Sequence, residues 1–258
     1  MTDSAALQDL RDRYLTLLAR SLTDTTHSHT TTCSGPNAGT LQELVSEHPR
    51  WTGDDWPLVA ETMVGMRRLE NLRSLLASIL TDNVPGDFIE CGVWRGGASI
   101  FAAGVLQAYG SDRGVWAADS FAGLPPPDVE KYPLDKDIVL HRIPYLAVSL
   151  EIVQQNFSRY GVLSDKVHFV RGLFRDSLPA LRDRQWCLIR ADCDMYESTH
   201  DVLVNLYAGL APGGYIIADE YYHMIECRTA VEDFRREHGI TEPIVQIDRQ
   251  AAYWRKSG

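Results

Sequence analysis

Short apolar runs alternate with amphipathic segments through the last two thirds of the chain. Apolar runs of strand length occupy 87–91, 114–119, 167–171, 186–191 and 214–219. Segments with apolar positions at helical spacing occupy 98–109, 146–160, 197–210 and 225–237. This alternation predicts an α/β fold with a doubly wound, largely parallel sheet. Two last runs, 244–248 and 251–255, are close enough for a hairpin, whose second strand would lie antiparallel in that sheet.

The first 83 residues have a different pattern. Apolar positions recur at helical spacing in 5–22 and again in 57–81, where Met63 joins a leucine-rich stripe. The polar, threonine-rich segment 23–40 between them predicts a mobile loop. We therefore expect a helical N-terminal region, 1–83, followed by the main domain, 84–258. The long connection 121–144 shows neither helical nor strand periodicity. Loops of that length are usually functional or mobile.

Composition narrows the function classes. The chain has 258 residues, 45% of them apolar, and a formal net charge of −10. An excess of negative charge disfavours nucleic acid and anionic membranes as partners. The basic pairs Arg67-Arg68 and Arg235-Arg236 are expected on solvated helix faces.

Cysteine usage predicts the compartment. Five cysteines, an odd number without any Cys-x-x-Cys spacing, indicate a reducing environment and neither a disulfide framework nor a zinc knuckle. The N-terminus has no long apolar segment, so neither a signal peptide nor a membrane span is expected. Together these features predict a cytoplasmic protein.

A glycine-rich turn follows the first predicted strand of the sheet, in the stretch "ECGVWRGG". Ligands of open α/β sheets bind at the carboxyl ends of the strands. The spacing is neither G-x-G-x-x-G nor that of a P-loop, and Glu90 at the turn would repel phosphates. A ligand with an ammonium group and a ribose, such as S-adenosylmethionine, fits better, with Asp119 at the next strand end for the ribose hydroxyls. A tight turn capped by its own side chains is the alternative.

The turn at 171–177 is a candidate for binding adenine, because Leu173 and Phe174 are apolar and Asp176 is polar. Taken alone, the same residues could simply pack an edge of the core.

Four acids follow the fourth and fifth strands: Asp192 and Asp194, then Asp219 and Glu220. Neighbouring parallel strands end at one edge of the sheet, so these carboxylates should cluster. Each pair about 4 Å apart costs roughly 4 kcal/mol at an effective dielectric near 20. Shared protons or a bound cation would offset that repulsion. Oxygen ligands without histidine or thiolate favour Mg²⁺, although Mn²⁺ or Ca²⁺ would also fit. Separate helix-capping acids, with Asp194 as one cap, are the alternative.

Several stretches together resemble the macrocin O-methyltransferase (TylF-like) family. They include "FIECGVWRGGASI", "ADSFAGLP", "ADCDMYEST" and "LYAGLAPGGYIIADEYY". The resemblance implies a class I S-adenosylmethionine-dependent methyltransferase, with a Rossmann-like seven-stranded sheet and an N-terminal helical lid. Members methylate sugar hydroxyls of antibiotics with the help of Mg²⁺, and the resemblance suggests homo-oligomers.

The resemblance also implies roles for individual residues. Asp192, Asp219 and Glu220 correspond to metal ligands, and Asp194 to the general base. The cofactor-binding positions it implies are Met63, Glu90, Gly92, Trp94, Ser99, Asp119, Ser120, Leu173, Phe174 and Asp192. Two departures weaken the correspondence, because the family usually has glycine at Cys193 and aspartate at Glu220.

These features lead to one function hypothesis and two alternatives. The hypothesis is methyl transfer to a sugar hydroxyl of a glycosylated natural product, in which a cation acidifies the hydroxyl and Asp194 takes its proton. The alternatives are a catechol-type O-methyltransferase and a non-catalytic cofactor- or metal-binding regulator. His141 and His223 are rival bases.

Overall fold

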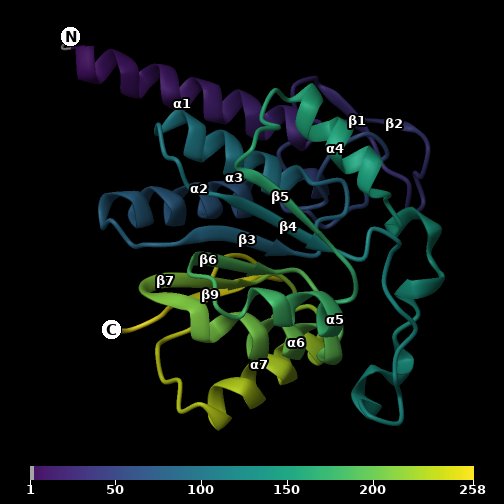
Figure 1. The fold of residues 1–258 in the computed structure, drawn as a ribbon. Coiled ribbons are helices and arrows are strands. Elements are labelled where there is room, and N and C mark those ends of the chain that lie inside the picture. Colours follow the sequence, from purple (N-terminus) through teal and green to yellow (C-terminus); the bar gives the residue numbers. More distant parts are fainter. Residues whose placement is uncertain (1–2) are drawn as a thin grey trace.

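The computed structural model describes residues 3–258, and its centre is a seven-stranded sheet with helices on both faces (Figure 1). The strands are β3 (Asp87–Cys91), β4 (Val115–Asp119), β5 (Val167–Arg171), β6 (Trp186–Ala191), β7 (Leu210–Ala218), β8 (Val245–Gln246) and β9 (Ala252–Arg255). Their order is β5-β4-β3-β6-β7-β9-β8. Strands β3 to β7 are parallel to one another, and β9 pairs antiparallel with β7. The predicted fold class and the antiparallel closing strand are confirmed.

Strand order reverses between β3 and β6, because the chain first builds outward through β4 and β5 and then returns to the other side of β3. Such a switch point leaves a crevice at the carboxyl ends of the central strands. The end of β6 also lies beside the end of β7, so the sheet brings the two acidic segments to one edge.

Helices form two layers around the sheet, as Figure 1 shows. One layer holds α1 (Asp3–Leu22), α2 (Met66–Thr81), α3 (Gly97–Ala108) and α4 (Leu150–Arg159). The other holds α5 (Phe174–Ser177), α6 (Tyr196–Leu206) and α7 (Ile225–Glu237). Short 3-10 helices occupy Pro49–Trp51, Pro133–Asp137, Leu140–Arg142, Pro144–Leu146, Leu178–Leu181 and Tyr207–Gly209. Within the described residues, no helix combines the length and the apolar character needed to cross a membrane.

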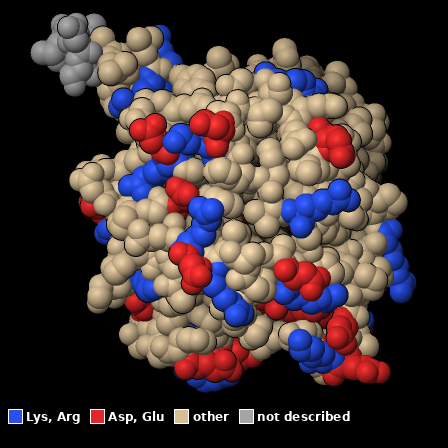
Figure 2. Space-filling view, viewed as in Figure 1, with Lys and Arg blue, Asp and Glu red and all other residues tan. Residues whose placement is uncertain are grey.

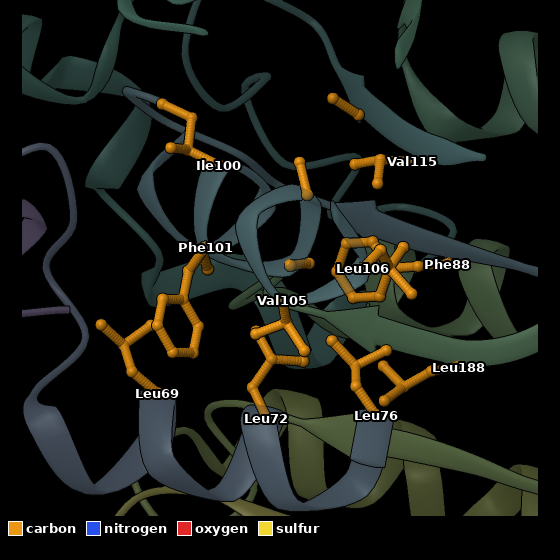
Figure 3. Close-up of a cluster of buried hydrophobic side chains, with 14 of the residues drawn as sticks. Leu69, Leu72, Leu76, Phe88, Ile100, Phe101, Val105, Leu106, Val115 and Leu188 are labelled. Carbon is orange, nitrogen blue, oxygen red and sulfur yellow. The ribbon is translucent and has the colours of Figure 1, made fainter. Parts of the chain in front are cut away.

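The N-terminal helices are built into the main core. In Figure 3, Leu69 of α2 points toward Phe101 of α3 and Leu72 points toward Val105, and all four are buried. Leu15 and Leu22 of α1 belong to the same cluster. Burying each such side chain stabilises the fold by about 1.5–3 kcal/mol relative to exposure. The two helices therefore contribute to the stability of the sheet domain.

The segment between α1 and α2 differs from the prediction. Strand β1 (His29–Thr31) lies within the stretch 23–40 that was expected to be a mobile loop, and it pairs antiparallel with β2 (Leu41–Glu43), which follows that stretch. Thr30 is buried, and its hydroxyl donates to Asp24 at 2.7 Å. Threonine is β-branched and suits strands, a preference that the polar composition of the segment concealed. Helix α2 begins only at Met66, so Met63, which was expected on a helix within 57–81, lies before the helix.

The long connection between β4 and α4 is anchored at its middle. Asp135 is fully buried, and its two carboxylate oxygens accept from the backbone N–H groups of Tyr196, at 2.7 Å, and Glu197, at 3.0 Å. A residue of this loop thus satisfies the free N–H groups at the start of α6. The contact fixes the loop beside the carboxyl end of β6.

Surface charge is mixed on the face shown in Figure 2, where acidic and basic side chains lie among uncharged surface. The expectation that both basic pairs are solvated is wrong for one member of each. Arg67 and Arg236 are exposed, whereas Arg68 and Arg235 are buried. Helical periodicity explains the split, because consecutive residues point about 100° apart.

Candidate active site

A cavity opens at the carboxyl ends of β3, β4, β5 and β6. Gly92 and Trp94 line it after β3, Asp119 and Ser120 after β4, Gly172 to Arg175 after β5, and Asp192 to Asp194 after β6. Met63 contributes from the N-terminal region. The position agrees with the rule that open α/β sheets bind ligands at this edge.

The glycine turn requires glycine at residue 92. Gly92 has a φ of +89°, and a Cβ atom there would lie 1.9 Å from the carbonyl oxygen of Asp192. The backbones are also tied together, since the N–H of Asp192 donates to the carbonyl of Cys91 at 2.9 Å. Only a residue without a side chain lets the two strand ends approach this closely.

Asp119 holds the other side of this turn. Its carboxylate accepts from the backbone N–H groups of Val93 and Phe121, each at 2.8 Å. Burial raises the pKa of Asp119, whereas these N–H donors act to lower it. Each carboxylate oxygen has a second lone pair, so the residue can fix the turn and still accept from a ligand hydroxyl.

Eight of the ten residues predicted to bind the cofactor line this cavity: Met63, Gly92, Trp94, Asp119, Ser120, Leu173, Phe174 and Asp192. Glu90 and Ser99 are not among its lining residues. Both are at most 1% exposed; the Ser99 hydroxyl donates to Glu90, and Arg190 pairs with the same carboxylate. The buried arginine explains this location, because it gives Glu90 a partner inside the core. Burial raises the pKa of Glu90 to about 7, while Arg190 acts against that shift.

Three acids come together beside the cavity. Carboxylate oxygens of Asp192, Asp194 and Glu220 all lie within 4.8 Å of one another. Burial, followed by the charge of neighbouring carboxylates, raises the pKa of Asp192 to about 6 and of Asp194 to about 7. The Glu220 pKa is raised for the same two reasons.

This trio fits a hard divalent cation. Its donors are all carboxylate oxygens, as Mg²⁺ prefers. The Oε2 atom of Glu220 is buried and has no hydrogen-bond partner among residues 3–258. A cation would occupy that free acceptor and relieve the mutual repulsion of the three carboxylates.

Asp219, the remaining predicted ligand, lies outside this trio of oxygens. Its Oδ2 is 2.6 Å from Nη1 of Arg68, and its Oδ1 is 2.6 Å from Nη2 of Arg190. Burial alone would raise the pKa of Asp219, but the two guanidinium groups outweigh it and hold the pKa below its usual value. Repulsion among the acids is therefore offset partly by buried arginines, which the sequence analysis did not identify. The sequence did carry a signal for Arg190, because this arginine lies inside the apolar run "WCLIRA" of a predicted strand.

Asp194 lies at the cavity with a strained backbone. Its φ is +57°, in the left-handed region that a non-glycine residue seldom adopts. Such strain is found preferentially at functional sites. The two rival bases are elsewhere, since neither His141 nor His223 lines this cavity, and His223 is exposed.

The chain matches proteins of known activity over nearly its whole length. Residues 11–256 match the model of the family described as Macrocin-O-methyltransferase (TylF). The chain is 45% identical to mycinamicin III 3''-O-methyltransferase of Micromonospora griseorubida over 249 residues, covering 95% of this chain and 96% of that protein.

Two further comparisons agree. Identity is 44% over 255 residues to the 8-demethyl-8-(2,3-dimethoxy-alpha-L-rhamnosyl)-tetracenomycin-C 4'-O-methyltransferase of Streptomyces olivaceus, covering 96% of this chain and 94% of that protein. The solved structure of the O-methyltransferase NovP superposes with a TM-score of 0.88 at 39% identity, covering 96% of this chain and all of that one.

Proposed function

The chain belongs to the macrocin O-methyltransferase family, and from that premise we propose that it methylates a sugar hydroxyl of a glycosylated natural product. As a member, it is an S-adenosylmethionine-dependent O-methyltransferase. The tetracenomycin relative acts on a rhamnosyl derivative, which supports a sugar hydroxyl as the acceptor here. Antibiotic biosynthesis is the corresponding pathway class.

One observation carries the metal-assisted form of this proposal: the oxygens of Asp192, Asp194 and Glu220 converge, and two of these residues, Asp192 and Asp194, line the cavity. Asp192 and Glu220 would hold Mg²⁺. Asp219 would be the third ligand implied by the family resemblance, because each of its oxygens has a second lone pair besides the one directed at an arginine. Asp194 would then remain available as the base.

The chemistry requires a methyl group, an acidified hydroxyl and a proton acceptor. S-adenosylmethionine supplies the methyl group on a sulfonium, and Mg²⁺, when bound, acts as a Lewis acid toward the hydroxyl. Asp194 receives the hydroxyl proton on its carboxylate while the oxygen–carbon bond forms and the sulfur–carbon bond breaks, which leaves S-adenosylhomocysteine. Gly92 and Asp119 position the donor.

A methyl-transfer assay tests this proposal. The enzyme would be incubated with isotope-labelled S-adenosylmethionine and matched panels of demethylated antibiotic glycosides and simple catechols. We expect label on a glycoside, loss of activity after treatment with a chelator, and recovery with Mg²⁺. Label on catechols alone would favour the catechol-type alternative, and full activity in the chelator would contradict metal assistance.

We also propose that the protein is a homo-oligomer. The support is a stripe of exposed apolar side chains on α1: Leu7 is 58% exposed, Leu10 64% and Leu17 63%. In Figure 1 the first half of α1 extends beyond the rest of the molecule. Analytical ultracentrifugation would test this, because Leu10→Glu should lower the mass of the assembly and a monomeric wild type would contradict it.

A boundary near residue 83, with the N-terminal region as a lid over the cofactor, is a further proposal. Two contacts support it: Met63 lines the cavity, and the N–H of Gly97 donates to the Glu61 carbonyl at 2.9 Å. If the region is a lid, S-adenosylhomocysteine should slow proteolysis between α1 and α2. We propose the cytoplasm as the location, since four buried cysteines remain thiols.

A further inference from the structure

The end of the cavity farthest from Glu220 along the sheet has polar groups that methyl transfer does not use. Leu173, Phe174 and Arg175 line it from the turn after β5, and Glu197 and Asp201 line it from the first turns of α6. We call these five residues the outer end of the cavity. The turn after β5 lies beside the end of β4 and so beside Asp119, where the resemblance implies binding of the cofactor's ribose.

Glu197 has one carboxylate oxygen without a partner. The residue is 4% exposed, and its Oε1 accepts from Nη1 of Arg175 at 2.7 Å. Its Oε2 is buried and has no hydrogen-bond partner within the part of the chain that the structure describes. A buried acceptor that is left unpaired costs about 1–3 kcal/mol, more when it is charged. A ligand that donates a hydrogen bond at this point would remove that cost.

The place of Glu197 is fixed from two sides. Its backbone N–H is held by Asp135 at 3.0 Å, and its side chain is held by Arg175. The Asp135 contact comes from the long loop after β4, far away in sequence. A carboxylate oriented in this way is preorganised, because little freedom is lost when a ligand binds.

The chemistry of the outer end matches a purine ring. Leu173 and Phe174 offer apolar surface for the flat faces of the ring, and Glu197 offers an acceptor at its edge. Adenine carries an amino group at C6 that donates hydrogen bonds. On the proposed placement of the cofactor in this cavity, we propose that Oε2 of Glu197 accepts from the 6-amino group of its adenine and makes Glu197 a determinant of cofactor specificity.

This assignment differs from the sequence-based expectation, which placed Asp176 near adenine. The Asp176 side chain is 71% exposed, and the residue is not among those that line the cavity. Sequence position alone could not distinguish the two acids, because Glu197 reaches the site from a different element of the fold.

Calorimetric titration with two ligands tests the inference. One ligand is S-adenosylhomocysteine, and the other is its analogue with hydrogen in place of the 6-amino group. We expect wild type to prefer S-adenosylhomocysteine by about tenfold or more, as a site built around a hydrogen bond discriminates against a ligand lacking the donor. Glu197→Met should bring the two affinities close together, whereas Glu197→Gln keeps an acceptor oxygen and should retain most of the preference.

Asp176→Asn is the matched control and should keep the wild-type ratio of affinities. If the wild type bound both ligands with equal affinity, the inference would be overturned. That measurement needs no variant, so the test does not depend on the folding of Glu197→Met. The inference would also be overturned if Glu197→Met kept the wild-type ratio of the two affinities, or if Asp176→Asn lost it. Failure of wild type to bind S-adenosylhomocysteine at all would instead count against the proposed cofactor site.

Discussion

Arg190 and Asp219 form a buried ion pair across neighbouring strands, with Nη2 of Arg190 2.6 Å from Oδ1 of Asp219. The sheet register explains the contact. Arg190 pairs with Ile217, and Asp219 follows Ile217 by two residues, so it lies on the same face. On the other side Arg190 pairs in register with Glu90 of β3, whose carboxylate it also contacts. One arginine therefore joins carboxylates from the two strands that flank β6.

Removing this arginine should destabilise the fold. Arg190→Met leaves Glu90 and Asp219 as buried charges without their shared partner, and breaking a buried pair costs about 3–5 kcal/mol. Urea unfolding followed by circular dichroism would measure the loss. Arg236→Met, which removes an exposed arginine, is the control and should unfold at the wild-type urea concentration. Equal midpoints for both variants would contradict the structural role of Arg190.

Alanine at position 92 should damage both stability and cofactor binding. Its Cβ atom would collide with the Asp192 carbonyl oxygen, so the backbone of Asp192 would have to move. Gly110→Ala is a matched control, since Gly110 also has positive φ, +66°, but a Cβ atom there would have nothing within 4 Å. The control should cost about 1–2 kcal/mol from backbone strain alone. Gly92→Ala should cost clearly more and weaken binding of S-adenosylhomocysteine in calorimetry; equal effects would contradict the close approach.

Replacing the proposed base should separate binding from turnover. Asp194→Asn should bind S-adenosylhomocysteine as wild type does and lose about 10²–10⁴-fold in the rate of methyl transfer, the usual contribution of general base catalysis. Single-turnover kinetics with labelled cofactor would measure the rate. His141→Ala, which changes a rival base outside the cavity, should stay active. An active Asp194→Asn variant would remove Asp194 from this role.

Asp201 should make stability depend on pH. Burial, followed by the charge of Glu197, raises its pKa from 3.8 to about 6 in the folded protein. The folded state thus binds the proton more tightly than the unfolded state, so the stability from this group is present below pH 3.8 and is lost as pH rises toward 6. Asp201→Asn should raise the urea midpoint at about pH 7 but not at about pH 3.5. The exposed Asp165→Asn controls for loss of one negative charge, and an equal gain in both variants would contradict the argument.

Much of the fold followed from local pattern. Strands β3 to β7 are apolar runs, and the helices between them have apolar positions at helical spacing, so element type and order were predictable. Threonines in β1 misled the prediction because their polar hydroxyls mask a strand preference. The sequence pattern placed Met63 on a helix. An apolar residue that precedes a helix can match the spacing of the helix's apolar positions by chance.

The sequence by itself determined that acids follow two neighbouring parallel strands, and therefore that carboxylates meet at one edge of the sheet. Only the tertiary structure decided which carboxylates face one another and which face arginines. Arg68 contacts Asp219 across 151 residues of chain, and Arg175 contacts Glu197 from a different strand end. Local periodicity specifies the face on which a side chain lies, whereas its partner depends on packing between distant segments.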